Sequence, residues 1–358
     1  MCVERNLECI YITGENIIDK QSGMSMPRKI DPKAALFRKS RELGEGEIRG
    51  YNFDDRFDAR KFFDSYRDTG FQATNLGKAI GLAKAMQKDK ATIFLGFTSN
   101  VSTSGLRDII TYLVKERKVH FLVTTTGGLE EDIIKTHGKF LHGSFDADGA
   151  ELRRNGVNRT GNIFIPNERY IWFEGFMSKV LEKAYSRQKK SGKPMDSVEL
   201  VKMMGAELSD SKKKEESFTY WAYRNNIPLL CVPLADGAIG DHLYFFKKAH
   251  PNFDIGLIGE VKLLYDTVLN VEKAGALIIG GSVPKHHIMN ALMLREGADY
   301  TVYINTAYEQ DGSNAGANPN EAKSWGKAAP TKNDVKVWGD ASIIFPILVA
   351  AAFKLNDE

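Results

Sequence analysis

The chain has 358 residues, of which 42% are hydrophobic and 27% charged, a composition that is ordinary for a globular protein with a buried core. Its 49 basic residues nearly balance its 46 acidic ones, so the net charge is only +3. A surplus this small, with no obviously polybasic face, excludes the electrostatic footprint of a nucleic-acid-binding protein. The composition therefore favours a protein partner or a small-molecule substrate.

The cysteines and the apolar segments indicate the compartment. Cys2, Cys9 and Cys231 form no C-x-x-C pair and no even set, which fits a reduced, intracellular protein. The N-terminal segment carries too many charges for a signal peptide. The longest apolar stretch, residues 343–355, contains Pro346 and is too short to span a bilayer. We expect a cytoplasmic protein with no membrane attachment.

The N-terminal region differs in pattern from the rest of the chain. Residues 1–45 lack strong periodicity and mix charged residues with glycine and proline, which predicts either an arm that docks on a partner surface or a frayed leader. Residues 57–68 and 75–90 place apolar residues at helical spacing, so two helices are expected to lead into the globular part. No linker interrupts the globular part, and we expect one domain over residues 46–358.

Short apolar runs alternate with helical stretches through the remainder of the chain. The runs are apolar throughout rather than alternating, which is typical of strands buried on both faces of a sheet. Helical stretches such as residues 104–118 and 286–298 separate them. This alternation predicts an α/β fold with a doubly wound, mostly parallel sheet. The predicted strands cover residues 91–96, 121–126, 162–166, 227–233, 276–281, 300–305 and 335–340.

Small and polar residues follow nearly every predicted strand. In open α/β sheets, ligands bind in the crevice beyond the carboxyl ends of the strands, where glycine and helix N-termini accommodate phosphate groups. Any one of these turns, taken alone, is better explained by helix capping, because N-caps prefer Ser, Thr, Asp and Asn. Their number in one sheet favours a nucleotide, although no G-x-G-x-x-G fingerprint is present.

The stretch from Tyr308 to Asn333 predicts a functional loop. It has no regular periodicity and lies between two predicted strands, and structureless loops longer than about 12 to 15 residues inside compact domains are usually functional or disordered. Trp325 and Lys327 argue against a disordered tract. Lys327 has two interpretations: a solvated surface lysine, or a covalent nucleophile whose amine is activated by burial.

Acidic residues near this loop and at the strand ends suit a polyamine, since each ammonium group pairs with a carboxylate and an aromatic face adds cation–π attraction. The alternative is that these acids favour helix N-termini through the macrodipole. His286 and His287 are adjacent and point apart on a helix, so they do not form a metal pair. We expect one of them to act in acid–base chemistry, the other to be packed in the core, and no metal site.

Seven motifs, taken together and in order, closely resemble those of the deoxyhypusine synthases, from about Arg49 to about Phe353. They are TSN (98–100), TTTGGLEED (124–132), ADGAIGD (235–241), GGSVPKHH (280–287), YINTA (303–307), EAKSWGK (321–327) and GDAS (339–342).

The resemblance implies a Rossmann-like domain that binds NAD and spermidine, with Lys327 as the nucleophile and His286 assisting proton transfer. The implied NAD contacts are Ser99, Asn100, Thr103, Thr125, Thr126, Gly127, Glu131, Asp236, Gly281, Thr306, Ala307, Asp340 and Ala341. The implied spermidine contacts are Glu130, Glu131, Asp241, His286, Gly312, Ser313, Asn314, Glu321 and Trp325.

The resemblance also implies a reaction and an assembly. The butylamine arm of spermidine passes through an imine with Lys327 to a lysine of the translation initiation factor five A precursor, and diaminopropane is released. Members of the family are typically homotetramers with active sites at dimer interfaces. An N-terminal arm covers a neighbour's site, a role that residues 1–45 would fill here.

The sequence departs from the family pattern at four positions. Asn314 and Ala315 stand where Asp and Ser are expected, which removes one carboxylate from the amine-binding set and one hydroxyl near the cofactor. Leu292 replaces the usual Asn, and Thr126 replaces an Ala. If nothing compensates, the missing carboxylate weakens spermidine binding by roughly 1.5 to 3 kcal/mol.

The sequence leaves two other functions open. Homospermidine synthase shares the fold and the nucleophile but gives the butylamine to putrescine. A non-catalytic regulatory subunit would activate a paralogue in a heteromer, and loss of the nucleophile would mark it, whereas Lys327 is present.

Overall fold

The computed structural model describes residues 31–43 and 46–355. The chain divides into two units, Met1–Gly46 and Glu47–Glu358. In the first unit, the described residues form α1 (Pro32–Leu36), whose N-terminus is capped by the Asp31 carboxylate accepting the Lys33 N–H at 2.9 Å. The arm predicted over residues 1–45, including Cys2 and Cys9, lies largely outside the described residues.

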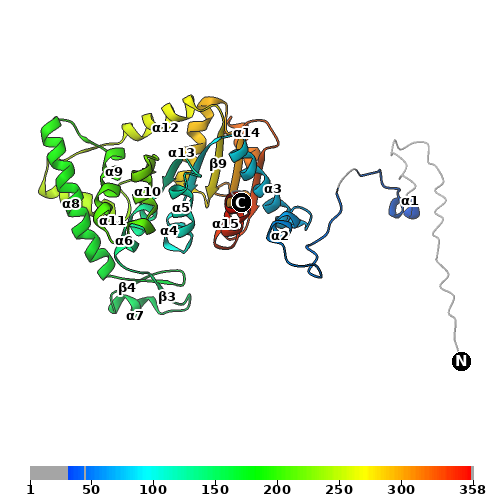
Figure 1. Ribbon diagram of the computed structural model, residues 1–358, viewed down its shortest axis with the longest axis horizontal. Coiled ribbons are helices and arrows are strands. Elements are labelled where there is room, and N and C mark those ends of the chain that lie inside the picture. Colours follow the sequence, from blue (N-terminus) through cyan, green and yellow to red (C-terminus); the bar gives the residue numbers. More distant parts are fainter. Residues whose placement is uncertain (1–30, 44–45, 356–358) are drawn as a thin grey trace, which may run out of the picture. The chain divides into compact units, whose positions relative to one another are not determined.

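A six-stranded parallel sheet forms the centre of the second unit (Figure 1). Its strand order is β11-β10-β9-β1-β2-β7. Each strand overlaps one of the predicted apolar runs, so the doubly wound parallel sheet is confirmed. The strands are β1 (Thr92–Phe97), β2 (Phe121–Thr124), β7 (Leu229–Cys231), β9 (Ala274–Ile279), β10 (Tyr300–Asn305) and β11 (Asp334–Trp338).

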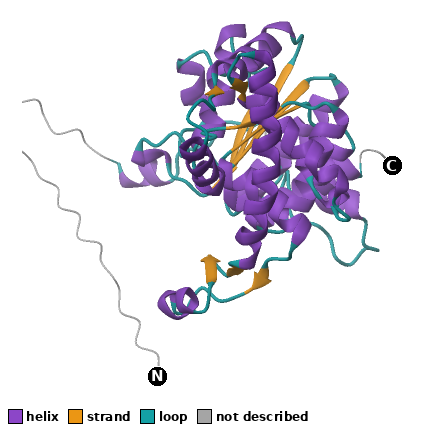
Figure 2. Cartoon of the chain, turned by 90° about the vertical axis from the view of Figure 1, so that its left-hand side faces the viewer, coloured by secondary structure: helices purple, strands orange, loops and turns teal. Residues whose placement is uncertain are grey.

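Helices cover both faces of this sheet, and Figure 2 shows the strands enclosed between them. Side chains alternate between the faces: Ile93 and Leu95 belong to one buried cluster, while Phe94 between them belongs to another. The first cluster includes residues of α3 (Phe71–Lys88), α5 (Leu106–Lys115), α6 (Thr126–His137), α10 (Phe218–Asn225) and α15 (Ala341–Val349). The second includes residues of α12 (Ile258–Asn270) and α13 (Ser282–Leu292).

The remaining elements complete the second unit. The helices are α2 (Ala59–Ser65), α4 (Ser99–Thr103), α7 (Gly149–Arg154), α8 (Glu168–Ser191), α9 (Ser197–Glu207) and α11 (Gly237–Ala249). Of these, α8 and α9 also contribute buried residues to the first cluster. A two-stranded sheet pairs β6 (Met195–Asp196) with β8 (Ile255–Gly256). Within the described residues, no helix is long and apolar enough to cross a membrane.

The prediction that residues 162–166 belong to the parallel sheet is wrong. They form β5 (Ile163–Pro166) in a separate antiparallel sheet with β3 (Leu141–His142) and β4 (Val157–Thr160). Only Gly161 and Asn162 separate β4 from β5, and Gly161 has a φ of +58°. Such a short connection joins antiparallel strands, because a parallel pair needs a long crossover. Figure 2 shows this small sheet projecting from the helical body.

The loop predicted over residues 308–333 also contains regular structure. α14 (Pro319–Ser324) begins after Asn318, whose side-chain oxygen accepts the Glu321 N–H at 2.9 Å. Asparagine followed by proline at the first helical position is a sequence signal for a helix start, and the absence of apolar periodicity masked it. A short 3₁₀ turn, Glu309–Asp311, lies earlier in the same segment.

Candidate active site

The residues predicted to bind ligands lie at the carboxyl-terminal edge of the parallel sheet. The chain proceeds from β1 outward to β2 and β7, then returns to β9 on the other side of β1 and continues outward to β10 and β11. The reversal between β1 and β9 is the topological switch point where open α/β sheets bind ligands. At this point Gly280 has a φ of +87°, and a Cβ there would lie 2.7 Å from Thr98 Oγ1.

The edge has two parts, one on each side of the switch point. We call the residues that follow β1, β2 and β7 the first half-site. Those that follow β9, β10 and β11 form the second half-site.

In the first half-site, the N-termini of α4 and α6 approach each other closely. The hydroxyl groups of Ser99 and Thr125 lie 2.5 Å apart. A Cβ at Gly127 would lie 2.7 Å from Ser99 Oγ, so only glycine fits at this position. Two helix N-termini at a switch point, with glycine between them, can accommodate phosphate groups. Asn100 belongs to the same turn, and its side-chain oxygen accepts the Thr98 hydroxyl.

Thr126, a predicted cofactor contact, directs its side chain inward. The residue is fully buried, and its hydroxyl donates to the Pro233 carbonyl and lies 3.6 Å from Cys231 Sγ. The departure from alanine at this position is therefore accommodated by a bond that ties α6 to the segment after β7. Its side chain is not available to a ligand.

Three consecutive acidic residues of α6 are buried, and each has a different partner element. Glu130 accepts the Ile239 N–H of α11 at 3.0 Å. Glu131 accepts the hydroxyl of Thr103 of α4. Asp132 accepts Arg107 Nε of α5 at 2.7 Å. Successive helical residues point about 100° apart, so one acidic run reaches three neighbours.

Burial changes the ionisation of the first two carboxyls. Glu130 is 6% exposed and Glu131 is 8% exposed. Loss of hydration raises the pKa of each to about 7. A cation placed against these groups would favour their ionised forms.

A pocket of about 640 Å³ opens beside Glu130 and contains one other predicted spermidine contact, Asp241. Glu174 adds a third carboxyl group, and Tyr170 and Phe245 add aromatic surface. Carboxylates with aromatic walls suit an ammonium group. The sequence predictions missed Tyr170 and Glu174, although both lie on α8 at the i and i+4 positions of one helix face. Asp236, a predicted cofactor contact, is the exposed residue that precedes α11.

In the second half-site, Lys327, Trp325 and His286 lie near one another. Lys327 Nζ is 5.3 Å from the centroid of the Trp325 ring, and Trp325 is 63% exposed. Burial is the main cause that lowers the pKa of His286, and the positive charge of Lys327 lowers it further. His287 is partly buried, whereas His286 is exposed. Among the described residues, no group of three His, Cys, Asp or Glu side chains could hold a metal ion.

The predicted loop contacts Gly312, Ser313 and Asn314 are exposed at the edge of this half-site. Asn314 Nδ2 donates to the Ser282 carbonyl at 2.9 Å, so the residue that replaces the expected aspartate ties the loop to α13. Glu321 lies in α14 and is exposed.

The predicted cofactor contacts of the second half-site follow their strands directly. Thr306 and Ala307 come after β10, and the Thr306 carbonyl accepts Trp338 Nε1 at 3.0 Å. The Asp340 side chain caps α15 by accepting the Ser342 N–H at 2.8 Å. Ala341 is the first residue of that helix. A Cβ at Gly281 would lie 2.6 Å from Ala315, so the loop packs directly on this glycine.

The predicted spermidine contacts fall into two groups along the chain. Within the described residues, no hydrogen bond, ion pair or ring contact joins Glu130, Glu131 or Asp241 to any predicted contact of the second half-site. The two groups follow strands on opposite sides of the switch point.

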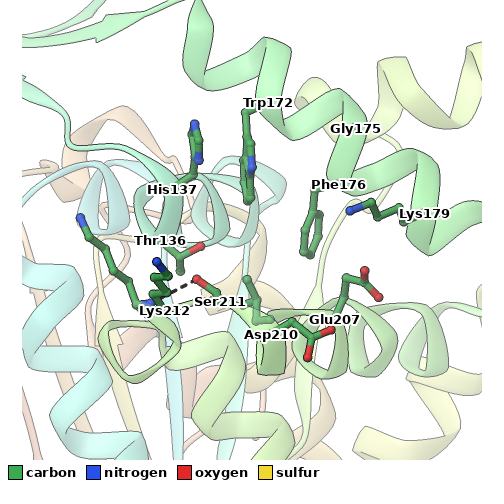
Figure 3. Close-up of a pocket in the computed structure, with 12 residues that line it drawn as sticks. Thr136, His137, Trp172, Gly175, Phe176, Lys179, Glu207, Asp210, Ser211 and Lys212 are labelled. Carbon is green, nitrogen blue, oxygen red and sulfur yellow. Dashed lines mark hydrogen bonds between the residues drawn. The ribbon is translucent and has the colours of Figure 1, made fainter.

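A second pocket lies at the other end of α6, away from the predicted site. His137, Trp172 and Phe176 stack along one side of it, with the first two rings parallel and 4.6 Å apart (Figure 3). None of the predicted site residues lines it.

Comparisons with known proteins give one consistent result. A family model described as deoxyhypusine synthase matches residues 61–352. A deoxyhypusine synthase of Senecio vernalis is 41% identical, over 91% of this chain and 94% of its own. A Methanocaldococcus jannaschii protein with the same family name is 45% identical, over 81% of this chain and 91% of its own. The crystal structure of an Entamoeba histolytica protein described as a deoxyhypusine synthase has a TM-score of 0.58 at 28% identity, covering 86% of this chain and 97% of that one.

Proposed function

Because the chain belongs to the deoxyhypusine synthase family, we propose that it moves the 4-aminobutyl group of spermidine through Lys327 to a lysine of the translation initiation factor five A precursor. The observation that carries this proposal is the arrangement of Lys327 beside the Trp325 ring and His286. An aromatic face attracts an ammonium ligand, and a neutral imidazole accepts a proton.

NAD is the cofactor that the family uses, and the first half-site suits it. The close approach of Gly127 to Ser99, which leaves no room for a Cβ, suits a phosphate group held by helix N-termini. Glu131, which accepts the hydroxyl of Thr103 at the end of α4, would accept ribose hydroxyls. When bound, NAD would accept a hydride from spermidine and return it to the final product.

The chain's own residues carry the transfer. The amine of Lys327 adds to the carbon of the substrate imine and gives up a proton. The bond between that carbon and the diaminopropane nitrogen then breaks, and this nitrogen takes up a proton and leaves as an amine. His286 is suited to move that proton, because its lowered pKa keeps it neutral at pH 7. The acceptor lysine then attacks the Lys327 imine in the same way and frees Lys327.

The position of the two half-sites on opposite sides of the switch point supports a site shared between subunits. In a homodimer with twofold symmetry, the first half-site of one copy can face the second half-site of the other. A homotetramer built from two such dimers, in the cytoplasm, completes the proposal. Residues 1–45 would cover the entrance of a neighbour's site.

The test is mass spectrometry of acceptor mixtures. The purified chain is incubated with NAD and spermidine, once with the factor precursor and once with putrescine. A butylamine mass gain on one precursor lysine, with diaminopropane released, is the expected result. Homospermidine in the second tube alone would assign the chain to polyamine synthesis, and no product in either would indicate a subunit that needs a partner.

A further inference from the structure

The loop after β10 directs a run of backbone carbonyls toward Lys285. The ammonium group of Lys285 donates to the carbonyls of Asn314 and Ala317, both at 2.6 Å, and more distantly to that of Ala315 at 3.5 Å. A lysine ammonium has three protons to donate, so all three have acceptors in this loop.

A second lysine holds the carbonyl that Lys285 does not reach. Lys336 of β11 donates to the Gly316 carbonyl at 2.6 Å and to the Ala307 carbonyl at 2.8 Å. The four consecutive carbonyls of residues 314–317 therefore all accept lysine protons. A surface loop with this arrangement is fixed from two sides.

Lys285 is buried to an extent that is rare for lysine. Only 3% of it is exposed, and its Nζ lies 4.3 Å from the centroid of the buried Tyr303 ring. Burial is the main cause that lowers the pKa of Lys285 to about 8, and the positive charge of Lys336 adds to it. A buried charge is tolerated when hydrogen bonds replace its hydration, and the loop carbonyls do so here.

The loop that Lys285 fixes contains predicted contacts of the second half-site, and it lies just before α14, Trp325 and Lys327 in the chain. Gly312, Ser313 and Asn314 stand at its exposed end. Lys285 itself lies on α13, one residue before His286. The same loop is tied to the start of α13 by the Asn314 amide and packs on Gly281.

We propose that Lys285 is a positioning residue for amine binding. Its ammonium group holds residues 314–317 against α13, which keeps the polar end of the loop in line with His286 and Lys327. The inference rests on the proposed function, since it takes this loop to be part of the spermidine site. Lys285 does not act in the chemistry, because its protons are taken by carbonyls and its side chain is enclosed.

The experiment compares Lys285→Met with the parent chain. Methionine keeps an unbranched side chain but cannot donate. Hydrogen exchange is measured on peptides that cover residues 308–318, together with the affinities for spermidine and for NAD. The expected result is faster exchange in this loop and spermidine binding weakened by about tenfold or more, since charge-assisted bonds are lost. NAD affinity and the rate at saturating spermidine stay near those of the parent, so the effect falls on KM. Lys332→Met, at an exposed lysine of the same segment, is the matched control and leaves all of these unchanged.

Unchanged loop exchange in Lys285→Met would overturn the proposal, whatever spermidine does. Failure of the parent chain to bind spermidine would instead overturn the proposed function, and the exchange measurement would still decide the role of Lys285. If Lys285→Met does not fold, Lys285→Gln keeps one donor group without the charge. Loop exchange and spermidine affinity equal to those of the parent in that variant would also overturn the proposal.

Discussion

The two half-sites differ in the burial of their main predicted contacts. The first half-site buries Glu130 and Glu131, although Asp236 and Asp241 are exposed, and neither buried carboxyl ionises readily without a partner. The second half-site exposes Trp325 and Glu321 and leaves Lys327 half-buried.

Both halves use the same device to hold their backbone. In the first half-site, Lys135 donates to the carbonyls of Ser102, Thr103 and Ser104 at the end of α4. In the second, Lys285 holds the loop after β10. Burial lowers the pKa of each lysine to about 8. The difference between the halves therefore lies in the groups that would meet the ligand, and it suggests that each half is incomplete without the other.

The largest effect is expected from removing the nucleophile. Lys327→Arg keeps the positive charge but cannot form an imine, so aminobutyl transfer should fall by at least about three orders of magnitude, as when a covalent route is lost. NAD binding, followed by calorimetry, should be nearly unchanged. Transfer at the full rate in this variant would remove Lys327 from the covalent role.

The second largest effect is expected at Asp132, whose buried carboxylate joins α6 to α5 beneath the first half-site. Asp132 is fully buried and accepts Arg107 Nε at 2.7 Å and the Ser217 hydroxyl at 2.6 Å. Asp132→Ala removes the closest carboxylate partner of the buried Arg107 and leaves it only longer ion pairs, with Asp108 at 3.9 Å and Glu216 at 4.0 Å. The variant should therefore lower the free energy of unfolding by about 3–5 kcal/mol. Urea denaturation measures this.

The control for that variant is Asp266→Ala, which removes an exposed ion pair with Lys262. Exposed pairs contribute about 0–1 kcal/mol. Equal losses in the two variants would contradict the assignment of Asp132 as a buried support.

The buried acids predict a dependence of stability on pH. The folded-state pKa of Glu130 and of Glu131, about 7, lies above the ordinary value of 4.5. Their protonated forms therefore stabilise the fold below pH 4.5, and this stabilisation is lost as the pH rises through 7. Glu130→Gln and Glu131→Gln should reduce the fall in Tm between pH 5 and pH 8 that the parent shows. The exposed Glu116→Gln should not, and an unaltered pH dependence in both buried variants would contradict the prediction.

The smallest effect is expected at Asn314. Asn314→Asp restores the carboxylate that the family pattern has, and we expect it to tighten spermidine binding. The gain should be less than about tenfold, because the substitution also removes the amide bond to the Ser282 carbonyl. Titration calorimetry with spermidine measures it, with Asn314→Ala as the control that loses the bond and adds no charge. An affinity equal to or below that of the parent would count against a role for this position in amine binding.

The sequence predicts the sheet well because buried parallel strands are apolar along their whole length. The prediction fails at residues 162–166, where a two-residue turn decides the pairing, and at α14, where a cap rather than a hydrophobic face starts the helix. Neither feature appears as apolar periodicity.

The sequence identifies candidate site residues but not their distances. Which strand ends are neighbours depends on the strand order, which the apolar runs do not encode. For this reason the division of the spermidine contacts into two half-sites emerges only from the structure. The role of Lys285 is hidden for a similar reason, since the sequence shows neither that this lysine is buried nor which carbonyls it reaches.

The most direct test of the shared site is complementation between two inactive chains. Lys327→Ala disables the second half-site, and Asp241→Lys places a cation in the pocket of the first. Neither variant alone should transfer aminobutyl groups. If each site joins two chains, a mixed population of dimers should recover about a quarter of the parent activity, because half of the dimers are mixed and each has one intact site of two. Verified mixed oligomers with no recovered activity would contradict the account and place the whole site within one chain.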